Sequence, residues 1–234
     1  MKKVIIFDLY DTVLKDISFS FKKGITELYQ KFFSEKCSLE EFMEFEETFY
    51  PLYSQRKVDN SEVCLIQDEI PFFYEKFGVP KPKSWEELDY DIMNRMQKDV
   101  LLDEVRDTLK SLQMQGIDMY ILSNSIFTGT STRRLLDDFG ILHYFKKVYS
   151  SADYKTRKPG TRFYEIAIDE VLASHPGMTK ENILYVGNDY VTDVKGAISA
   201  GLDVVWYNVN HLQNQEGLDI LEIDDFRQLI NILL

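Results

Sequence analysis

The pattern of apolar and polar positions changes character twice along the chain. It opens with a continuous apolar run, Val4–Phe7, that ends directly at Asp8. A short apolar run without polar alternation is typical of a strand that is buried on both faces of a parallel sheet. From about residue 18 to 97 the apolar positions recur at helical spacing, and beyond Leu101 short apolar runs alternate with helical segments. The pattern therefore predicts an α/β unit that carries a helical insertion.

Within the insertion, the spacing predicts long amphipathic helices with recognisable start signals. We expect them over residues 21–33, 39–53, 63–77 and 85–96. Ser38 and Ser84 are each followed, three positions later, by a glutamate, which is the spacing of a capping box at a helix N-terminus. The helix-breaking stretch 78–82, which contains glycine and two prolines, separates the last two helices.

The rest of the chain predicts alternating helices and strands. We expect strands over 118–122, 147–150, 183–186 and 203–207 and helices over 103–115, 130–139, 162–171, 193–200 and 225–233. Such alternation predicts an α/β fold with a doubly wound parallel sheet. Ligands of such sheets bind beyond the carboxyl ends of the strands, so the chemistry is expected there.

The acidic balance of the chain restricts its partners. The 234 residues carry a formal net charge of −12, which repels nucleic acid and anionic membrane surfaces. The first apolar run is too short for a signal-peptide core or a membrane span. We therefore expect a cytoplasmic monomer or homodimer with no nucleic-acid or membrane partner. A small anionic substrate is still compatible with this charge if nearby cationic side chains and a metal ion make the electrostatic potential at the site positive.

Polar residues follow four of the expected strands. They are Asp8, Asp11 and Thr12 after the first strand, Ser123 and Asn124 after the second, Lys158 after the third, and Asn188, Asp189 and Asp193 after the fourth. Such a set supplies the parts for phosphoryl transfer to a carboxylate nucleophile. A divalent cation would offset the repulsion between carboxylate and phosphate, and hard oxygen ligands such as Asp8 and Asp189 suit magnesium. Lys158 would neutralise the remaining charge, and the Ser123 hydroxyl could bind phosphate oxygens.

The segments FDLYDT, ILSN, RKP and VGNDYVTD resemble, in this order, the four motifs of the haloacid dehalogenase superfamily. The resemblance implies a Rossmannoid core over residues 1–16 and 98–234 and a small α-helical cap over 17–97. It also implies Asp8 as the nucleophile, Ser123 as a phosphate ligand and Lys158 as the charge stabiliser. The residues that it implies around Mg²⁺ are Asp8, Tyr10, Asp189 and Asp193, and those expected at the substrate are Ser123, Asn124, Thr12 and Tyr10.

The sequence departs from the family pattern at Tyr10. Phosphatases of this family usually carry there a second aspartate, which protonates the leaving group; here an aspartate follows one step later, as Asp11. A tyrosine is a poor general acid at neutral pH. We therefore expect either that Asp11 replaces the lost acid, or that the enzyme prefers esters with good leaving groups. The family also often has aspartate directly after the motif glycine, where this chain has Asn188, a possible neutral metal ligand.

Three functions remain open at this point. The first is metal-dependent hydrolysis of a small phosphorylated metabolite through an aspartyl-phosphate on Asp8. The second is 2-haloacid dehalogenation, because Tyr10 is similar to the dehalogenase branch, which needs no metal. The third is a catalytically weak binding protein that keeps the fold. The two acids of the fourth motif, Asp189 and Asp193, favour the first, since they would repel Asp8 without a cation.

Overall fold

In the computed structural model, which describes residues 2–214 and 216–233, six strands form one parallel sheet. Its order is β5-β4-β1-β6-β7-β8, and every neighbouring pair runs parallel. The strands are β1 (Val4–Phe7), β4 (Asp118–Ser123), β5 (Phe145–Ser150), β6 (Ile183–Gly187), β7 (Asp203–Tyr207) and β8 (Leu221–Ile223). The α/β fold with a parallel sheet that the sequence predicts is confirmed.

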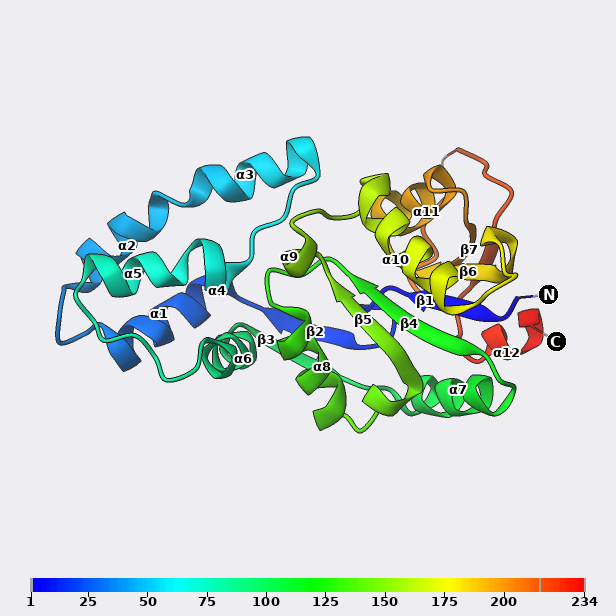
Figure 1. The fold of residues 1–234 in the computed structure, drawn as a ribbon, viewed down its shortest axis with the longest axis horizontal. Helices are drawn as coiled ribbons and strands as arrows, with labels where there is room; N and C mark the ends of the chain where they lie inside the picture. Colours follow the sequence, from blue (N-terminus) through cyan, green and yellow to red (C-terminus); the bar gives the residue numbers. More distant parts are fainter. Residues whose placement is uncertain (1, 215, 234) are drawn as a thin grey trace.

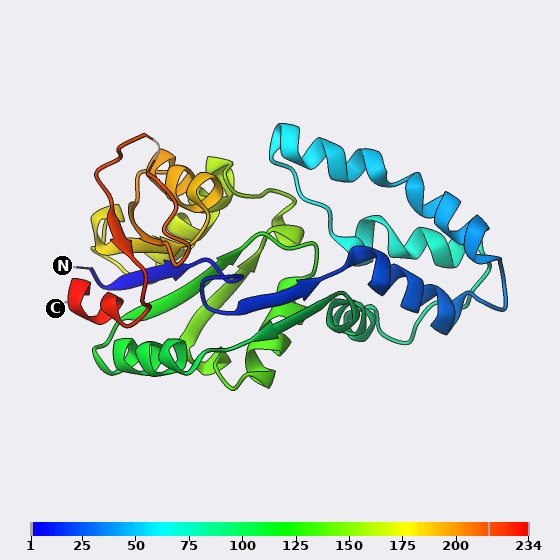
Figure 2. The same cartoon turned by 180° about the vertical axis from the view of Figure 1, so that it is seen from behind.

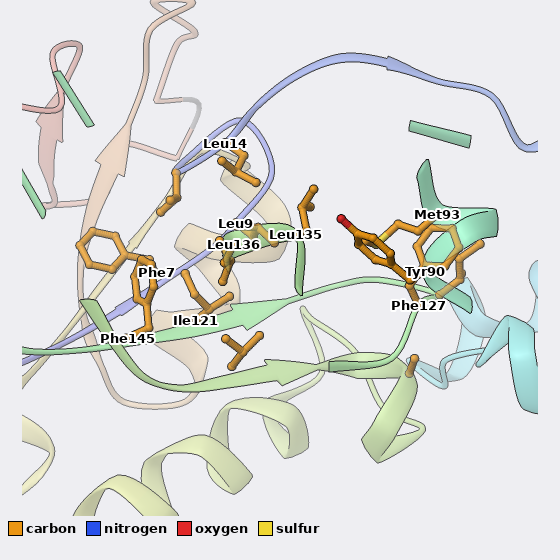
Figure 3. Close-up of a cluster of buried hydrophobic side chains, with 14 of the residues drawn as sticks. Phe7, Leu9, Leu14, Tyr90, Met93, Ile121, Phe127, Leu135, Leu136 and Phe145 are labelled. Carbon is orange, nitrogen blue, oxygen red and sulfur yellow. The ribbon is translucent and has the colours of Figure 1, made fainter. Parts of the chain in front are cut away.

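Helices cover both faces of this sheet (Figures 1 and 2). On one face lie α7 (Asp103–Met114), α8 (Gly129–Asp138) and α12 (Gln228–Leu233); on the other lie α10 (Thr161–Ser174) and α11 (Gly196–Ser199). Shorter segments are η1 (Leu142–Tyr144), α9 (Ser151–Tyr154), η2 (Lys180–Asn182) and η3 (Tyr190–Lys195). The alternating side chains of β1 serve both faces: Ile5 and Phe7 join the cluster drawn in Figure 3, whereas Val4 and Ile6 join a second cluster. This two-sided burial explains the continuous apolar run.

The helical insertion lies at the end of the molecule away from both chain termini (Figure 1). Its helices are α1 (Phe21–Phe32), α2 (Leu39–Glu47), α3 (Tyr50–Asp59), α4 (Leu65–Asp68), α5 (Ile70–Lys76) and α6 (Trp85–Met96). The strands β2 (Lys15–Phe19) and β3 (Gln97–Val100), which the pattern did not predict, pair as an antiparallel ribbon. The expected domain boundaries, 16/17 and 97/98, fall within this ribbon. Met1, Gln215 and Leu234, which the expected core range includes, lie outside the described residues.

Two of the expected long helices are each divided in two. The expected helix 39–53 ends at Glu47, and α3 begins at Tyr50 with Pro51 in its first turn. The expected helix 63–77 is divided at Glu69, and Pro71 again lies in the first turn of the following helix. Proline lacks the N–H that a continuing helix needs but fits a first turn. The predicted continuity was therefore wrong at both prolines.

None of the helices in the described part of the chain combines the length and the apolar character that crossing a membrane requires.

Two buried carboxyl groups lie inside the helical insertion. Glu46 and Glu69 are 2% and 0% exposed, and the Tyr53 hydroxyl donates a hydrogen bond to Glu69 Oε2 at 2.6 Å. Burial raises the pKa of Glu69 to about 8, against the hydrogen bond from Tyr53, and the Glu46 carboxylate adds to the rise. Burying a carboxylate without a paired cation is costly, so the neutral acid is the form that this site favours.

We expect Glu69→Gln to stabilise the protein at pH 9 by about 1–3 kcal/mol and to change little at pH 4.5. An unfolded glutamate ionises near its ordinary value of 4.5, whereas the folded one holds its proton up to about 8. Between these values the folded state binds more protons, so the parent loses stability as the pH rises, and glutamine removes this loss. Urea denaturation across this pH range measures it, with the exposed Glu47→Gln as control. Equal pH dependence in parent and Glu69→Gln would contradict the assignment.

Candidate active site

The carboxyl ends of three neighbouring strands bring the expected site residues together. Phe7 at the end of β1 is level with Ile121 of β4 and Val186 of β6. The Asp8 amide donates to the Val186 carbonyl at 2.8 Å, which fixes the backbone of Asp8 between the two flanking strands. Ser123 ends β4 one position further along the same edge. The register of the sheet therefore sets Asp8 and Ser123 on adjacent strand ends.

A buried ion cluster surrounds Asp8. The ammonium of Lys158, whose side chain is 1% exposed, lies 2.6 Å from Asp8 Oδ1 and 2.8 Å from Asp193 Oδ1. It also donates to the Tyr185 hydroxyl at 2.8 Å, and that hydroxyl donates to Asp193 Oδ1 at 2.9 Å. One cation thus bridges two carboxylates that lie far apart in the sequence.

Asn124 holds the backbone of Lys158 in place. Its Oδ1 accepts from the Lys158 amide and its Nδ2 donates to the Lys158 carbonyl, both at 2.9 Å. These two bonds use both ends of the side-chain amide. Asn124 thus positions Lys158, and its expected contact with the substrate stays a prediction. The Lys158–Pro159 peptide bond is cis.

The cluster raises the pKa of both Asp8 and Lys158, for different physical reasons. Burial raises the pKa of Asp8 to about 6; Lys158 opposes this rise and Asp193 adds to it. Burial alone would lower the pKa of Lys158, but the adjacent Asp193 and Asp8 carboxylates more than offset it, so the pKa stays above its ordinary value. Lys158 is therefore charged, and Asp8 is mostly ionised at neutral pH, as the expected nucleophile would have to be.

The Ser123 hydroxyl has no hydrogen-bond partner within the described residues, although the side chain is fully buried. A buried hydroxyl without a partner costs free energy, so such groups normally serve a ligand, an ion or an ordered water. Its place on the strand next to Asp8 fits a donor to a bound phosphate oxygen.

Two side-chain oxygens meet at Thr12. The Thr12 hydroxyl lies 3.0 Å from Asp8 Oδ2 and 3.2 Å from Asn188 Oδ1. Carboxylate and amide oxygens are hard ligands of the kind that magnesium prefers, and magnesium usually keeps several waters and substrate oxygens besides one or two protein ligands. No group of three His, Cys, Asp or Glu suited to a metal occurs in residues 2–214 and 216–233. The pair of Asp8 and Asn188 fits such a sparse magnesium site.

The structure directs the other expected metal residues elsewhere. Asp189 Oδ1 caps η3 by accepting from the amides of Val191 and Thr192. Asp193 uses Oδ1 for Lys158 and Tyr185, and Oδ2 accepts from the Asp189 amide. These contacts disfavour direct ligation of a metal by the two carboxylates, which stays a prediction. Asp193 is at the site as a partner of Lys158.

The side chains of Tyr10 and Asp11 point in different directions. The Tyr10 hydroxyl accepts from Gln97 Nε2 at 3.2 Å, so its side chain faces β3. Asp11, with a φ of 58°, pairs through Oδ1 with Lys15 at 3.0 Å. Asp11 lines one surface cavity and Tyr10 lines another. The structure thus does not bring Asp11 in to replace the missing acid.

Tyr185 is the member of the cluster that sequence reasoning missed. It lies inside β6, in an apolar run typical of a buried strand, and nothing in that pattern marks its buried hydroxyl as part of the site. Asn188 was foreseen only as a possible neutral ligand, and its position after the β6 glycine is the signal that pointed to it.

The family model for haloacid dehalogenase-like hydrolases matches residues 5–207, and this range includes all four strand-end segments. The chain belongs to the haloacid dehalogenase-like hydrolase family. Members of this family named as phosphatases occur among its curated relatives, so the chain is a hydrolase. The resemblance seen in the four motifs is confirmed at the level of the family.

Named relatives of this haloacid dehalogenase-like hydrolase include a nucleotidase. Pyrimidine 5′-nucleotidase PynA of Streptococcus pneumoniae is 30% identical over 179 residues, which cover 76% of this chain and 72% of PynA. YfnB of Bacillus subtilis, a HAD-hydrolase, is 31% identical over 134 residues, which cover 57% of this chain and 54% of YfnB.

Solved structures share the fold. YfnB bound to magnesium has a TM-score of 0.59 at 20% identity and covers 99% of this chain and 98% of its own. A 2-haloacid dehalogenase from Pseudomonas syringae has a TM-score of 0.68 at 18% identity and covers 100% and 98%. At these identities the likeness concerns the fold alone.

Proposed function

We propose that this chain hydrolyses a small phosphomonoester through an aspartyl-phosphate on Asp8. The observation that carries the proposal is the buried Asp8 carboxylate, paired at 2.6 Å with Lys158 beside the unpartnered Ser123 hydroxyl. The relative named pyrimidine 5′-nucleotidase supports a phosphorylated substrate.

The reaction then has two displacements. An Asp8 oxygen forms a bond to phosphorus while the bond to the ester oxygen breaks, and that oxygen takes a proton from solvent water to leave as the alcohol. Water next attacks the acyl phosphate, which releases phosphate and restores the carboxylate. The water that attacks in this second step returns a proton to solvent. Lys158 neutralises charge on Asp8 and the transferring group throughout, and the Ser123 hydroxyl donates to a phosphate oxygen.

Asp8 and Asn188 would hold a magnesium ion beside the nucleophile. When bound, the ion would neutralise charge between the Asp8 carboxylate and the incoming phosphate. Asp193 supports the site indirectly because it fixes the Lys158 ammonium at 2.8 Å.

The leaving group receives little help from the residues next to Asp8. Burial raises the pKa of Tyr10 well above its ordinary value, which makes the phenol a still weaker acid. Asp11 is paired with Lys15. We therefore propose that esters with good leaving groups, such as aryl or acyl phosphates, have a higher kcat than alkyl phosphates that the site binds equally well, since lost general acid catalysis costs about 10²- to 10⁴-fold.

We also propose that residues 17–97 act as a cap over the strand ends. Helix α6 contacts α8 of the α/β part, and Glu62 contacts Ser151 at 2.9 Å. A cap that closes would exclude water from the acyl phosphate and select the leaving group.

We expect Asn188→Asp to lower the magnesium concentration that gives half-maximal phosphate release by about 10-fold, because it adds a charged oxygen at the site. Asp189→Asn should leave this concentration within about a factor of three, since asparagine also caps helices. Initial rates on phenyl phosphate across a magnesium series measure both. Loss of magnesium activation in Asp189→Asn alone would instead identify Asp189 as the ligand.

Dehalogenation is the second candidate, and Tyr10 is the observation that favours it. Incubation with 2-chloropropionate and with phenyl phosphate, each with and without magnesium, separates the two. We expect phosphate release that needs magnesium and Asp8; halide release without metal would reverse the assignment.

A further inference from the structure

A cavity of about 210 Å³ adjoins the candidate active site on the side of the helical insertion. Tyr10, two positions after the nucleophile, lines it, as does Asn124, which holds the Lys158 backbone. Arg157, directly before Lys158, lines it as well. The cavity therefore lies where the part of a phosphomonoester that is not transferred would be accommodated.

An arginine pair, Arg56 and Arg157, contributes hydrogen-bond donors to this cavity. Glu62 joins them: its Oε1 lies 2.9 Å from Arg56 Nη1, and its Oε2 lies 3.6 Å from Arg157 Nε. Glu62 is 5% exposed and also accepts hydrogen bonds from the Ser151 hydroxyl and the Val63 amide. Both oxygens of its carboxylate therefore already have partners within the protein. Arg56 Nε and Arg157 Nη1 are buried and have no partner within the described residues.

An aspartate pair, Asp16 and Asp99, contributes acceptors to the same cavity. The two residues are directly opposite on β2 and β3, and each has a buried Oδ1 without a partner within the described residues. Like charges in this position destabilise a strand pair. Burial raises the pKa of both carboxyls, that of Asp99 to about 6. The charge of Asp16 adds to the rise at Asp99, and the charge of Asp11 adds to the rise at Asp16. Gln97 links the pair to the catalytic loop by donating to Asp99 Oδ2 at 2.9 Å and to the Tyr10 hydroxyl.

Four of the unpartnered buried polar atoms thus belong to residues around one cavity, two as donors and two as acceptors. Each such atom costs about 1–3 kcal/mol unless a ligand or water satisfies it. Among the lining residues three carboxyl groups outnumber two guanidinium groups, so the cavity offers no excess positive charge for a second anion.

Building on the phosphatase function proposed above, we propose that this cavity selects an uncharged polar leaving group. Such a group offers carbonyl or hydroxyl oxygens to the arginine pair and hydroxyl or N–H donors to the aspartate pair. Nucleosides and sugars share this chemistry. Phenyl groups offer neither contact, and a leaving group with a carboxylate meets the aspartate pair with like charge.

The test compares kcat/KM of the full chain with magnesium on uridine 5′-monophosphate, glucose 6-phosphate, phenyl phosphate and 2-phosphoglycolate. In Arg157→Gln and Asp99→Asn, we expect kcat/KM on the better polar substrate to fall about 10-fold or more relative to phenyl phosphate. The exposed Arg162→Gln and Asp137→Asn should leave every ratio unchanged. A larger change for uridine monophosphate assigns a nucleoside, and a larger change for glucose 6-phosphate assigns a sugar.

Two results would overturn the inference while leaving the proposed function intact. One is an equal change on all four substrates in both variants; the other is a parent that prefers 2-phosphoglycolate to both polar substrates. Absence of Asp8-dependent phosphate release from every substrate would overturn the proposed function and the inference together. Should Arg157→Gln fail to fold by circular dichroism, Asp99→Asn decides, because it keeps the size of a side chain that is only half-buried.

Discussion

Replacement of Asp8 by asparagine is expected to lower magnesium-dependent phosphate release on the order of 10⁴-fold or more, as loss of a covalent nucleophile does. Asparagine keeps the size of the side chain, but its amide neither attacks phosphorus nor carries the charge that pairs with Lys158 at 2.6 Å. Steady-state release of phosphate from phenyl phosphate measures the loss. Acid-quenched parent protein should also carry covalent phosphate, and Asp8→Asn should carry none.

The matched control is Asp137→Asn, which removes an exposed carboxylate of α8 and should keep the parent rate. An Asp8→Asn variant that retains more than a tenth of the parent rate, with the same covalent phosphate, would exclude Asp8 as the nucleophile.

Lys158→Met is expected to lower the free energy of unfolding by about 3–5 kcal/mol in the absence of divalent ions. The ammonium bonds to Asp8, Asp193 and Tyr185 together, and its side chain is 1% exposed. Without it, two buried carboxylates lie near each other with no cation between them. Urea denaturation measured in a chelator reports the loss.

Two further variants make this result specific. Lys195→Met removes a lysine whose ion pair with Glu216 is exposed, and should cost at most about 1 kcal/mol. In the double variant Lys158→Met/Asp193→Asn, removal of one carboxylate should restore part of the lost stability. A cost for Lys158→Met no larger than that for Lys195→Met would show that the cluster contributes little to folding.

Sequence patterns predicted the sheet because its central strand is buried on both faces. The run Val4–Phe7 has no polar position, and the structure places its alternating side chains in two different apolar clusters. The same logic predicted where chemistry would gather, since parallel strands end at one edge. Asp8, Ser123 and Lys158 all lie there.

Directions of side chains in the loops could not be predicted in this way. Asp189 and Asn188 are neighbours in a segment rich in polar residues, and only the capping of η3 decides that the aspartate turns to the helix. The local conformation of Asp11, with positive φ, likewise turns its carboxylate to Lys15. The β2–β3 ribbon escaped prediction because its strands are short and its residues are largely exposed or half-buried.

The ribbon has a mechanical consequence. The chain crosses between the helical insertion and the sheet twice through it, once in each direction, and the two crossings are bonded to each other from Lys15 and Val100 to Phe19 and Gln97. Because β2 and β3 are hydrogen-bonded to each other, a rotation of the helices relative to the sheet would bend both strands together. Asp16 and Asp99 are paired within this ribbon, so a rotation of the helices relative to the sheet would carry both carboxylates together.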